Sequence, residues 1–213
     1  ANNDQVVHGL YAAGECACVS VHGANRLGTN SLVDLVVFGR RSGNHMAEYC
    51  NQADLLPLPD DPAGEVMAEF ERIRNGSGGV KAAVLRTKMQ KSMTANVGVF
   101  RTEETMATAV ADLNELRESY SRSIQIDDKG SKFNTDLLEA WELGCLLELA
   151  EVTAVSARSR PESRGGHARE DYQKRNDQEW LKHTFYFRTE DGSYRLDYKP
   201  VTLGRYEPKE RVY

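Results

Sequence analysis

Residues 14–43 read GECACVSVHGANRLGTNSLVDLVVFGRRSG, and this stretch decides the fold of the first quarter of the chain. The apolar residues around position 10 predict a short strand that ends in glycine. Asn30 or Ser31 is a good N-cap for the apolar helix that follows. Between strand and helix lies the loop HGANRLG, whose arginine, Arg26, has glycines on both sides. A guanidinium in such a loop, just before a helix N-terminus, suits the binding of a carboxylate beside a cofactor.

The composition is that of an ordinary globular protein of 213 residues, with 40% apolar and 28% charged residues. The formal net charge of −5 argues against a protein that binds the phosphate backbone of nucleic acids. No apolar run approaches the roughly 20 residues that a membrane-spanning helix needs. The first residues, ANNDQVVHG, have neither the basic start nor the apolar core of a signal peptide. Membrane contact is therefore expected only through a partner.

The four cysteines form no CxxC pair. Cys16 and Cys18 alternate along the predicted strand, so both side chains should point to one face. We interpret these two, with Cys50 and Cys145, as small buried apolar residues in a reducing compartment. A metal site needs further ligands nearby, and none is predicted.

Three segments are predicted, and together they make an α+β chain. Residues 1–56 contain the strand, the loop and the helix. Residues 57–157 are helical, and the sequence PLPDDP at their start predicts a linker. Residues 158–213 form a small lobe, in which HTFYFR and YRLDYK flank EDGS at 190–193. Asp-Gly between two alternating runs is a strong signal for a β-hairpin.

Apolar spacing predicts which faces of the helices are buried in a bundle core. The helix from about Glu103 to Arg122 should turn these residues inward: Met106, Val110, Leu113, Leu116 and Tyr120. In the long helix after Asn134 the predicted inward residues are Leu138, Trp141, Cys145, Leu149 and Val152. Basic side chains gather in the first part of the helical segment, and we predict that they dock a partner: Arg72, Arg74, Lys81, Arg86, Lys88 and Lys91.

The motifs at 9–43, 97–104 (VGVFRTEE) and 162–184 resemble the flavoprotein subunit of succinate dehydrogenase and fumarate reductase. The resemblance covers essentially the whole chain and places it in the C-terminal portion of that subunit. It implies the last strand and helix of an FAD-binding α/β domain, then a helical bundle and a small C-terminal lobe with a β-hairpin. It also implies that the dinucleotide-binding glycines, the histidine joined covalently to FAD and the proton-transfer arginine lie upstream, in an N-terminal part of the same subunit. The 213 residues contain no GxGxxG. We therefore assign no catalytic residue here, and expect the chain alone to be inactive.

The resemblance also implies roles for individual residues. Arg26 would hold a carboxylate of succinate or fumarate, with the backbone of Gly28 and Thr29 close by. FAD would be bound by Gly14, Glu15, Arg26, Asn30, Ser31 and Leu32. The N-terminus of the helix would face the flavin, where its positive dipole end favours the reduced, more negative state. His22, Arg164 and His167 match the family, but their contact with substrate or cofactor stays open.

The implied partners are an iron–sulfur subunit and, through it, a membrane anchor that reaches quinone. The implied location is peripheral, on the cytoplasmic face of the inner cell membrane. Three alternatives remain open: fumarate reductase, which runs the same site in reverse, L-aspartate oxidase, which has a similar HGANRL segment, and a catalytically silent helical interaction module. The HAREDY lobe and the C-terminal hairpin favour the respiratory subunit over the oxidase.

Overall fold

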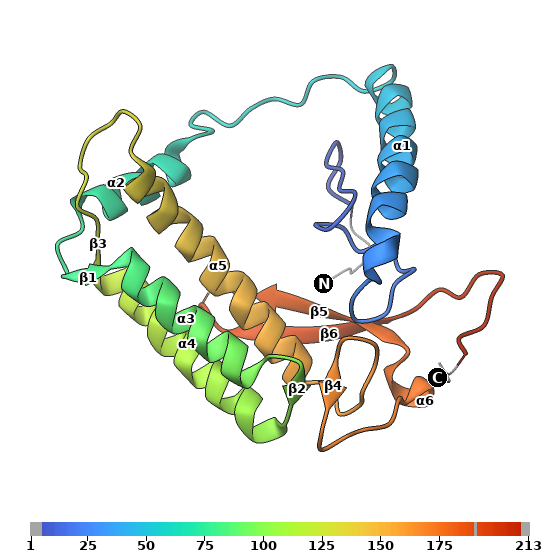
Figure 1. The fold of residues 1–213 in the computed structure, drawn as a ribbon. Coiled ribbons are helices and arrows are strands. Elements are labelled where there is room, and N and C mark those ends of the chain that lie inside the picture. Colours follow the sequence, from blue (N-terminus) through green and yellow to red (C-terminus); the bar gives the residue numbers. More distant parts are fainter. Residues whose placement is uncertain (1–5, 190, 210–213) are drawn as a thin grey trace. The chain divides into compact units, whose positions relative to one another are not determined.

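The computed structural model describes residues 6–189 and 191–209, which divide into two compact units (Figure 1). The first unit joins residues 1–55 with 164–166 and 174–213, and the second contains 56–163 and 167–173. The α+β class, with a helical bundle and a β-hairpin, is confirmed. The finer division into domains 1–56, 57–157 and 158–213 stays a prediction.

The second unit is a bundle of four helices: α2 (Gly64–Asn75), α3 (Ala82–Asn96), α4 (Glu103–Ser123) and α5 (Thr135–Arg158). Helices α3, α4 and α5 contact one another, and α2 packs on α5 (Figure 1). Two short pairs of parallel strands connect the segments at the ends of the helices. They pair β1 (Val80–Lys81) with β3 (Ile124–Gln125), and β2 (Phe100–Arg101) with β4 (Ala168–Arg169).

Helix α4 begins at Glu103, as the apolar spacing predicts, and a capping box fixes this start. The Thr102 side chain accepts a hydrogen bond from the Thr105 N–H, and the Thr105 hydroxyl accepts one from the Thr102 N–H in return. Glu103 and Glu104 add negative charge to the first turn, which the helix dipole favours. All five residues predicted to face inward are buried, so the predicted face of α4 is confirmed.

The predicted buried face of α5 is wrong. Leu138 is 47% exposed, Leu149 is 62% exposed, and Cys145 is exposed. The buried residues lie on the neighbouring stripe: Leu137, Ala140, Leu143, Leu147, Ala150 and Ala154. Leucines occur on both stripes, and the alanines of the buried one let α3 and α4 approach closely. Trp141, which is partly exposed, packs against Phe70 of α2 with the ring centroids 5.7 Å apart.

The first unit carries α1 (Ser31–Cys50), the short helix α6 (Asp177–Trp180) and a β-hairpin. A single 3-10 turn, η1 (Gly28–Asn30), leads into α1, so the predicted helix start is confirmed. The hairpin pairs β5 (Lys182–Arg188) with β6 (Tyr194–Pro200) in antiparallel register, as predicted. Its turn needs Gly192, whose φ is +82°.

Residues 6–27 contain no strand, although the sequence predicts one there. Gly9 and Gly14 have φ of +81° and +82°, which interrupts an extended run. No strand in the described ranges lies beside this segment to supply ladder hydrogen bonds. The four cysteines are all exposed, so the prediction that they are buried is also wrong.

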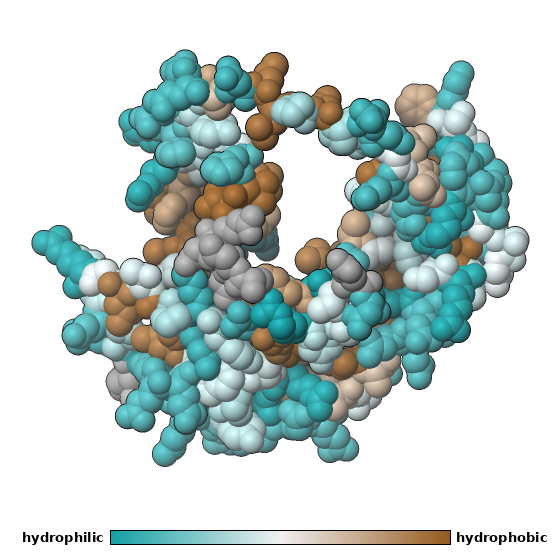
Figure 2. Space-filling model, turned by 180° about the vertical axis from the view of Figure 1, so that it is seen from behind, coloured by the Kyte–Doolittle hydropathy of each residue, from teal (hydrophilic) through white to brown (hydrophobic). Residues whose placement is uncertain are grey.

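Helix α1 exposes aliphatic side chains, among them Leu32, Val33 and Val36. In Figure 2 apolar atoms gather over the first unit on the side of this helix. In the part of the chain that the structure describes, no helix combines the length and the apolar character needed to cross a bilayer.

Candidate functional site

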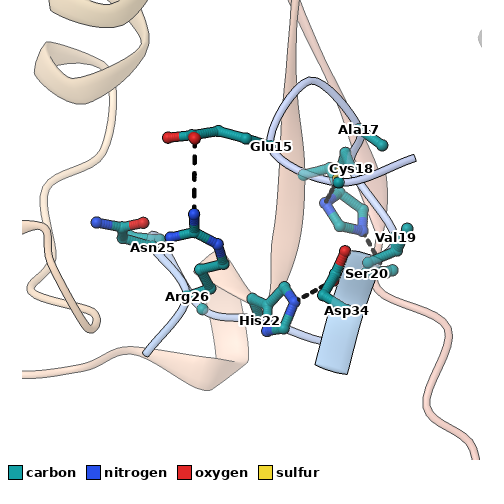
Figure 3. A pocket seen from close by; sticks show the side chains of 13 residues that line it. Glu15, Ala17, Cys18, Val19, Ser20, His22, Asn25, Arg26 and Asp34 are labelled. Carbon is teal, nitrogen blue, oxygen red and sulfur yellow. Dashed lines mark hydrogen bonds and ion pairs between the residues drawn. The ribbon is translucent and has the colours of Figure 1, made fainter. Parts of the chain in front are cut away.

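A cavity of about 260 Å³ lies in the first unit, where the 14–26 segment folds over the start of α1 (Figure 3). Its lining comes from this segment, from Asp34 in the first turn of α1, and from His183 at the beginning of β5. Three of the predicted site residues, Gly14, Glu15 and Arg26, are in the lining.

Arg26 is held loosely, with its guanidinium available for a ligand. Its side chain is 26% exposed, and its Nη2 lies 3.6 Å from Oε2 of Glu15, whose own side chain is 89% exposed (Figure 3). This separation is too long for a strong hydrogen bond, and a solvated ion pair of this kind contributes little. A carboxylate ligand that engages the planar fork through two hydrogen bonds therefore competes well with Glu15.

The other predicted residues lie on the approach to α1. Gly28, Thr29 and Asn30 form η1, and Ser31 and Leu32 are the first two residues of α1. The cavity lining does not include these five residues. The Asn30 side chain makes no capping hydrogen bond, so it does not occupy the helix N-terminus. That positive end is a suitable place for the electron-rich edge or the phosphates of a flavin nucleotide.

Gly14 shows how closely the loop approaches α1. A Cβ atom at this position would lie 2.3 Å from Cδ2 of Leu35, and the φ of +82° disfavours any other residue. The loop backbone thus lies directly against the Leu35 side chain of α1, an approach that glycine permits. A glycine-containing loop beside a helix N-terminus without a side-chain cap is a surface that suits a flavin nucleotide.

His22 and Asp34 form a short polar contact in the cavity. Nε2 of His22 lies 2.6 Å from Oδ2 of Asp34, and the side chains are 22% and 5% exposed (Figure 3). The sequence analysis left the role of His22 open and did not select Asp34. The sequence does mark Asp34 as unusual, because it is the one acid within the apolar run of residues 32–38.

His183 was also missed, and no local signal could have found it. Its Nε2 lies 2.7 Å from the Ser20 hydroxyl and its Nδ1 lies 3.7 Å from the Cys18 sulfur. Ser20 adopts a positive φ of 64°, which is uncommon for serine. These contacts join residues 163 and 165 positions apart in the sequence. Only the tertiary fold brings them together.

Gly165 and Gly166, in the motif at 162–184, pack against the loop that carries Arg26. A Cβ atom at Gly165 would lie 3.4 Å from the Ala24 nitrogen, and one at Gly166 would lie 3.2 Å from Cβ of Asn25. Arg164 anchors this turn through an ion pair of 2.8 Å with Asp177. The residues around 165 therefore support the HGANRLG loop from outside the cavity.

We expect Gly165→Ala to loosen this loop. The φ of Gly165 is +57°, which costs an alanine about 1 kcal/mol, and this strain falls on a turn whose new Cβ would contact the Ala24 nitrogen. Hydrogen exchange of the Ala24 and Asn25 amides should become faster. The control is Gly192→Ala, which carries the same kind of backbone strain (φ +82°) with no atom within 4 Å. Equal exchange at Ala24 in both variants would contradict the supporting role of Gly165.

His167 lies in the second unit, among arginines. The side chain is buried, Nδ1 lies 3.0 Å from Nη1 of Arg101, and Nε2 lies 3.1 Å from the backbone oxygen of Arg160. Burial, together with the nearby arginines, lowers the pKa of His167, which favours the neutral ring. Both nitrogens are thus used within the second unit, and this favours a structural role.

Arg169 and Asp171 form a bidentate pair in the same cluster. Nε of Arg169 donates to Oδ1 of Asp171 at 2.6 Å and Nη2 donates to Oδ2 at 2.7 Å. Asp171 also accepts a hydrogen bond of 2.8 Å from the Glu103 N–H, so it ties the start of α4 to this segment. These contacts, that of Arg169 first, lower the pKa of Asp171 to about 2.

We expect this pair to stabilise the second unit above about pH 4. Because the folded pKa of Asp171 lies below its usual 3.8, the stabilisation is lost as the pH falls from about 4 toward 2. Asp171→Asn should lower the free energy of unfolding by about 2 kcal/mol at pH 7, since the Arg169 side chain is almost fully buried. Denaturant unfolding at several pH values measures this difference, which should narrow toward pH 2. A difference that stays constant down to pH 2 would argue against the ion pair as its source.

Comparison with known proteins places the chain in a family. The sequence model of the family described as "Fumarate reductase flavoprotein C-term" matches residues 86–213, and that of an "FAD binding domain" matches residues 1–32. The succinate dehydrogenase flavoprotein subunit of Rickettsia bellii is 48% identical over 203 residues, which are 95% of this chain and 34% of that protein. The fumarate reductase flavoprotein subunit of Haemophilus influenzae is 41% identical, over 100% of this chain and 36% of that protein.

Solved structures of the same family are also similar to this chain. A chain of the quinol fumarate reductase of E. coli superposes with a TM-score of 0.88 at 42% identity, covering 96% of this chain and 36% of that one. The Sdh1 complex of Mycobacterium smegmatis gives a TM-score of 0.80 at 30% identity, over 93% and 34% of the two chains. The chain therefore spans about a third of the length of these relatives. It belongs to the family of succinate dehydrogenase and fumarate reductase flavoprotein subunits and corresponds to their C-terminal portion.

Proposed function

We propose that this chain serves a flavoprotein that oxidises succinate to fumarate, with fumarate reduction as the alternative direction. The observation that carries the proposal is Arg26, held loosely by Glu15 in a cavity beside the N-terminus of α1. Succinate loses a hydride and a proton from its two central carbons. FAD, when bound, supplies the acceptor for the hydride.

Arg26 is the residue that we assign to substrate binding. Its fork binds one carboxylate and so orients the central carbons, while the backbone of Gly28 and Thr29 borders the same ligand. Gly14, Glu15, Asn30, Ser31 and Leu32 hold the cofactor, together with Arg26. The start of α1 supplies N–H groups and the positive dipole end there. No residue of this chain is assigned to proton transfer.

An anaerobic experiment tests this function. The FAD-containing flavoprotein that carries these residues is mixed with succinate, and in a second sample with L-aspartate, without oxygen. We expect succinate to bleach the flavin absorbance with one fumarate formed per flavin, and L-aspartate to leave it unchanged. Bleaching by L-aspartate alone would favour the oxidase alternative. Bleaching by neither would reject dicarboxylate oxidation.

Electrons then pass to an iron–sulfur subunit, and through it to a membrane anchor, in our proposal. The subunit would lie on the cytoplasmic face of the cell membrane as a peripheral protein. The basic residues predicted to dock that partner are partly neutralised. Arg72 pairs with Glu69 and Arg74 with Glu71, each at 2.7 Å, and Lys81 pairs with Asp127. Long-range attraction by this set is thus weaker than its charge suggests.

A further inference from the structure

We propose that His22 and Asp34 form a positioning pair that fixes the loop carrying Arg26, so that Arg26 meets its carboxylate ligand in one orientation. The inference rests on the function proposed for Arg26. It adds two residues that bind neither substrate nor cofactor but determine how well Arg26 does so.

The pair closes the segment in which Arg26 lies. His22 is the first residue of the HGANRLG loop, and Asp34 lies in the first turn of α1. Their hydrogen bond of 2.6 Å joins positions 12 residues apart and encloses the loop and η1 between its ends. Fixing both ends of a short, glycine-containing segment removes much of its conformational freedom. Arg26 therefore loses less conformational entropy when it binds a ligand.

Asp34 is not explained by packing. Its side chain is almost fully buried, and Oδ1 is a buried oxygen with no hydrogen-bond partner in the part of the chain that the structure describes. An unsatisfied buried oxygen costs about 1–3 kcal/mol. A leucine at this buried position would add apolar burial without that cost. The position of the acid is therefore better explained by its bond to His22 than by the stability of α1.

The geometry favours a positioning role over direct contact with substrate. Nε2 of His22 is committed to Asp34, and only 22% of the side chain is exposed (Figure 3). The ring lines the cavity four residues before Arg26, with Gly23 next to it. A ring fixed at this point holds the backbone of the loop against α1.

The test uses the FAD-containing flavoprotein that carries these residues, with fumarate as the probe. Fumarate binding is followed by its effect on the flavin spectrum, which gives a dissociation constant without turnover. We expect Asp34→Leu and His22→Ala each to weaken fumarate binding about tenfold at unchanged flavin content. The thermal midpoint should be kept in Asp34→Leu, which removes the buried carboxylate, whereas His22→Ala leaves that carboxylate without its partner and should lower the midpoint.

Three further variants separate positioning from other roles. His22→Gln should recover most of the affinity lost in His22→Ala, since its amide can donate to Asp34 from nearly the same place. The double variant His22→Ala/Asp34→Leu should be no weaker than either single variant, because both remove one interaction. His45→Ala is the matched control, an exposed histidine of α1 bonded to Tyr11 and outside the cavity, and it should leave binding unchanged.

Hydrogen exchange in the 213-residue chain reports on the loop directly. The amides of residues 23–29 should exchange faster in Asp34→Leu than in the parent, and His22→Gln should resemble the parent. The inference is overturned if Asp34→Leu binds fumarate within twofold of the parent, if the two single losses add in the double variant, or if exchange does not change. It is also overturned if affinity falls only in parallel with flavin content. Arg26→Lys separates the two proposals. If it also leaves fumarate binding intact, the proposed function fails, whereas weak binding by Arg26→Lys alone rejects only the positioning pair.

Discussion

Arg26→Lys should lower kcat/KM for succinate by about 30-fold or more in the complete flavoprotein, while FAD stays bound. Lysine keeps the positive charge but loses the planar fork that engages both oxygens of a carboxylate. The loss corresponds to about 2 kcal/mol of transition-state stabilisation, the size expected for a charge-assisted hydrogen bond. Glu15 lies at 3.6 Å and is mostly solvated, so its altered contact with residue 26 contributes little to the change.

Arg40→Lys is the matched control for this measurement. Arg40 is exposed on α1, in the same unit, and does not line the cavity. It should leave kcat/KM within about twofold of the parent. A normal kcat/KM for Arg26→Lys, with flavin bound, would remove Arg26 from the substrate site.

Leu143→Ala should lower the free energy of unfolding of the helical bundle by about 3 kcal/mol. Leu143 is fully buried on α5, where α5 packs against α3 and α4, and its truncation leaves a cavity in addition to the lost apolar burial. Denaturant unfolding of the 213-residue chain, followed by far-UV circular dichroism, measures the change, since the bundle holds most of the helical residues.

Leu149→Ala is the control variant for this prediction. Both leucines lie on α5, and the sequence pattern had placed Leu149 inward. Because Leu149 is 62% exposed and alanine is the better helix former, the change should stay within about 0.5 kcal/mol. A loss for Leu149→Ala that exceeds the loss for Leu143→Ala would mean that α5 turns its other face to the core.

The elements that the sequence predicted well carry local signals. The hairpin follows from an Asp-Gly turn between alternating runs, and α4 follows from a single apolar stripe. Helix α5 carries no such single stripe, since apolar residues lie on several of its sides. Its orientation depends on which stripe has the small residues that its neighbours require, and that is decided by contacts between helices.

The residues of the candidate site likewise fall into those that the sequence indicates and those that only the tertiary fold brings together. Arg26 was selected for its guanidinium in a glycine-flanked loop, and Gly14 and Glu15 for the resemblance of their segment to the family. All three line the cavity, and their roles stay predictions. The contacts of Asp34 with His22 and of Ser20 with His183 depend on the turn of the chain into α1 and on the return of β5. Neither contact leaves a pattern in the local sequence, apart from one acid in an apolar run.

The division of the chain between its two units has a consequence for biosynthesis. The bundle is built mainly from residues 56–163, so its four helices emerge from the ribosome one after another. The bundle can therefore assemble before the C-terminal part of the chain is made. The first unit must wait, because its cavity is lined by residues 14–34 and completed by His183. More than 140 residues separate those parts in translation order. During that interval the exposed aliphatic residues of α1 lack this part of their unit, which makes the nascent 31–50 segment a candidate for chaperone binding.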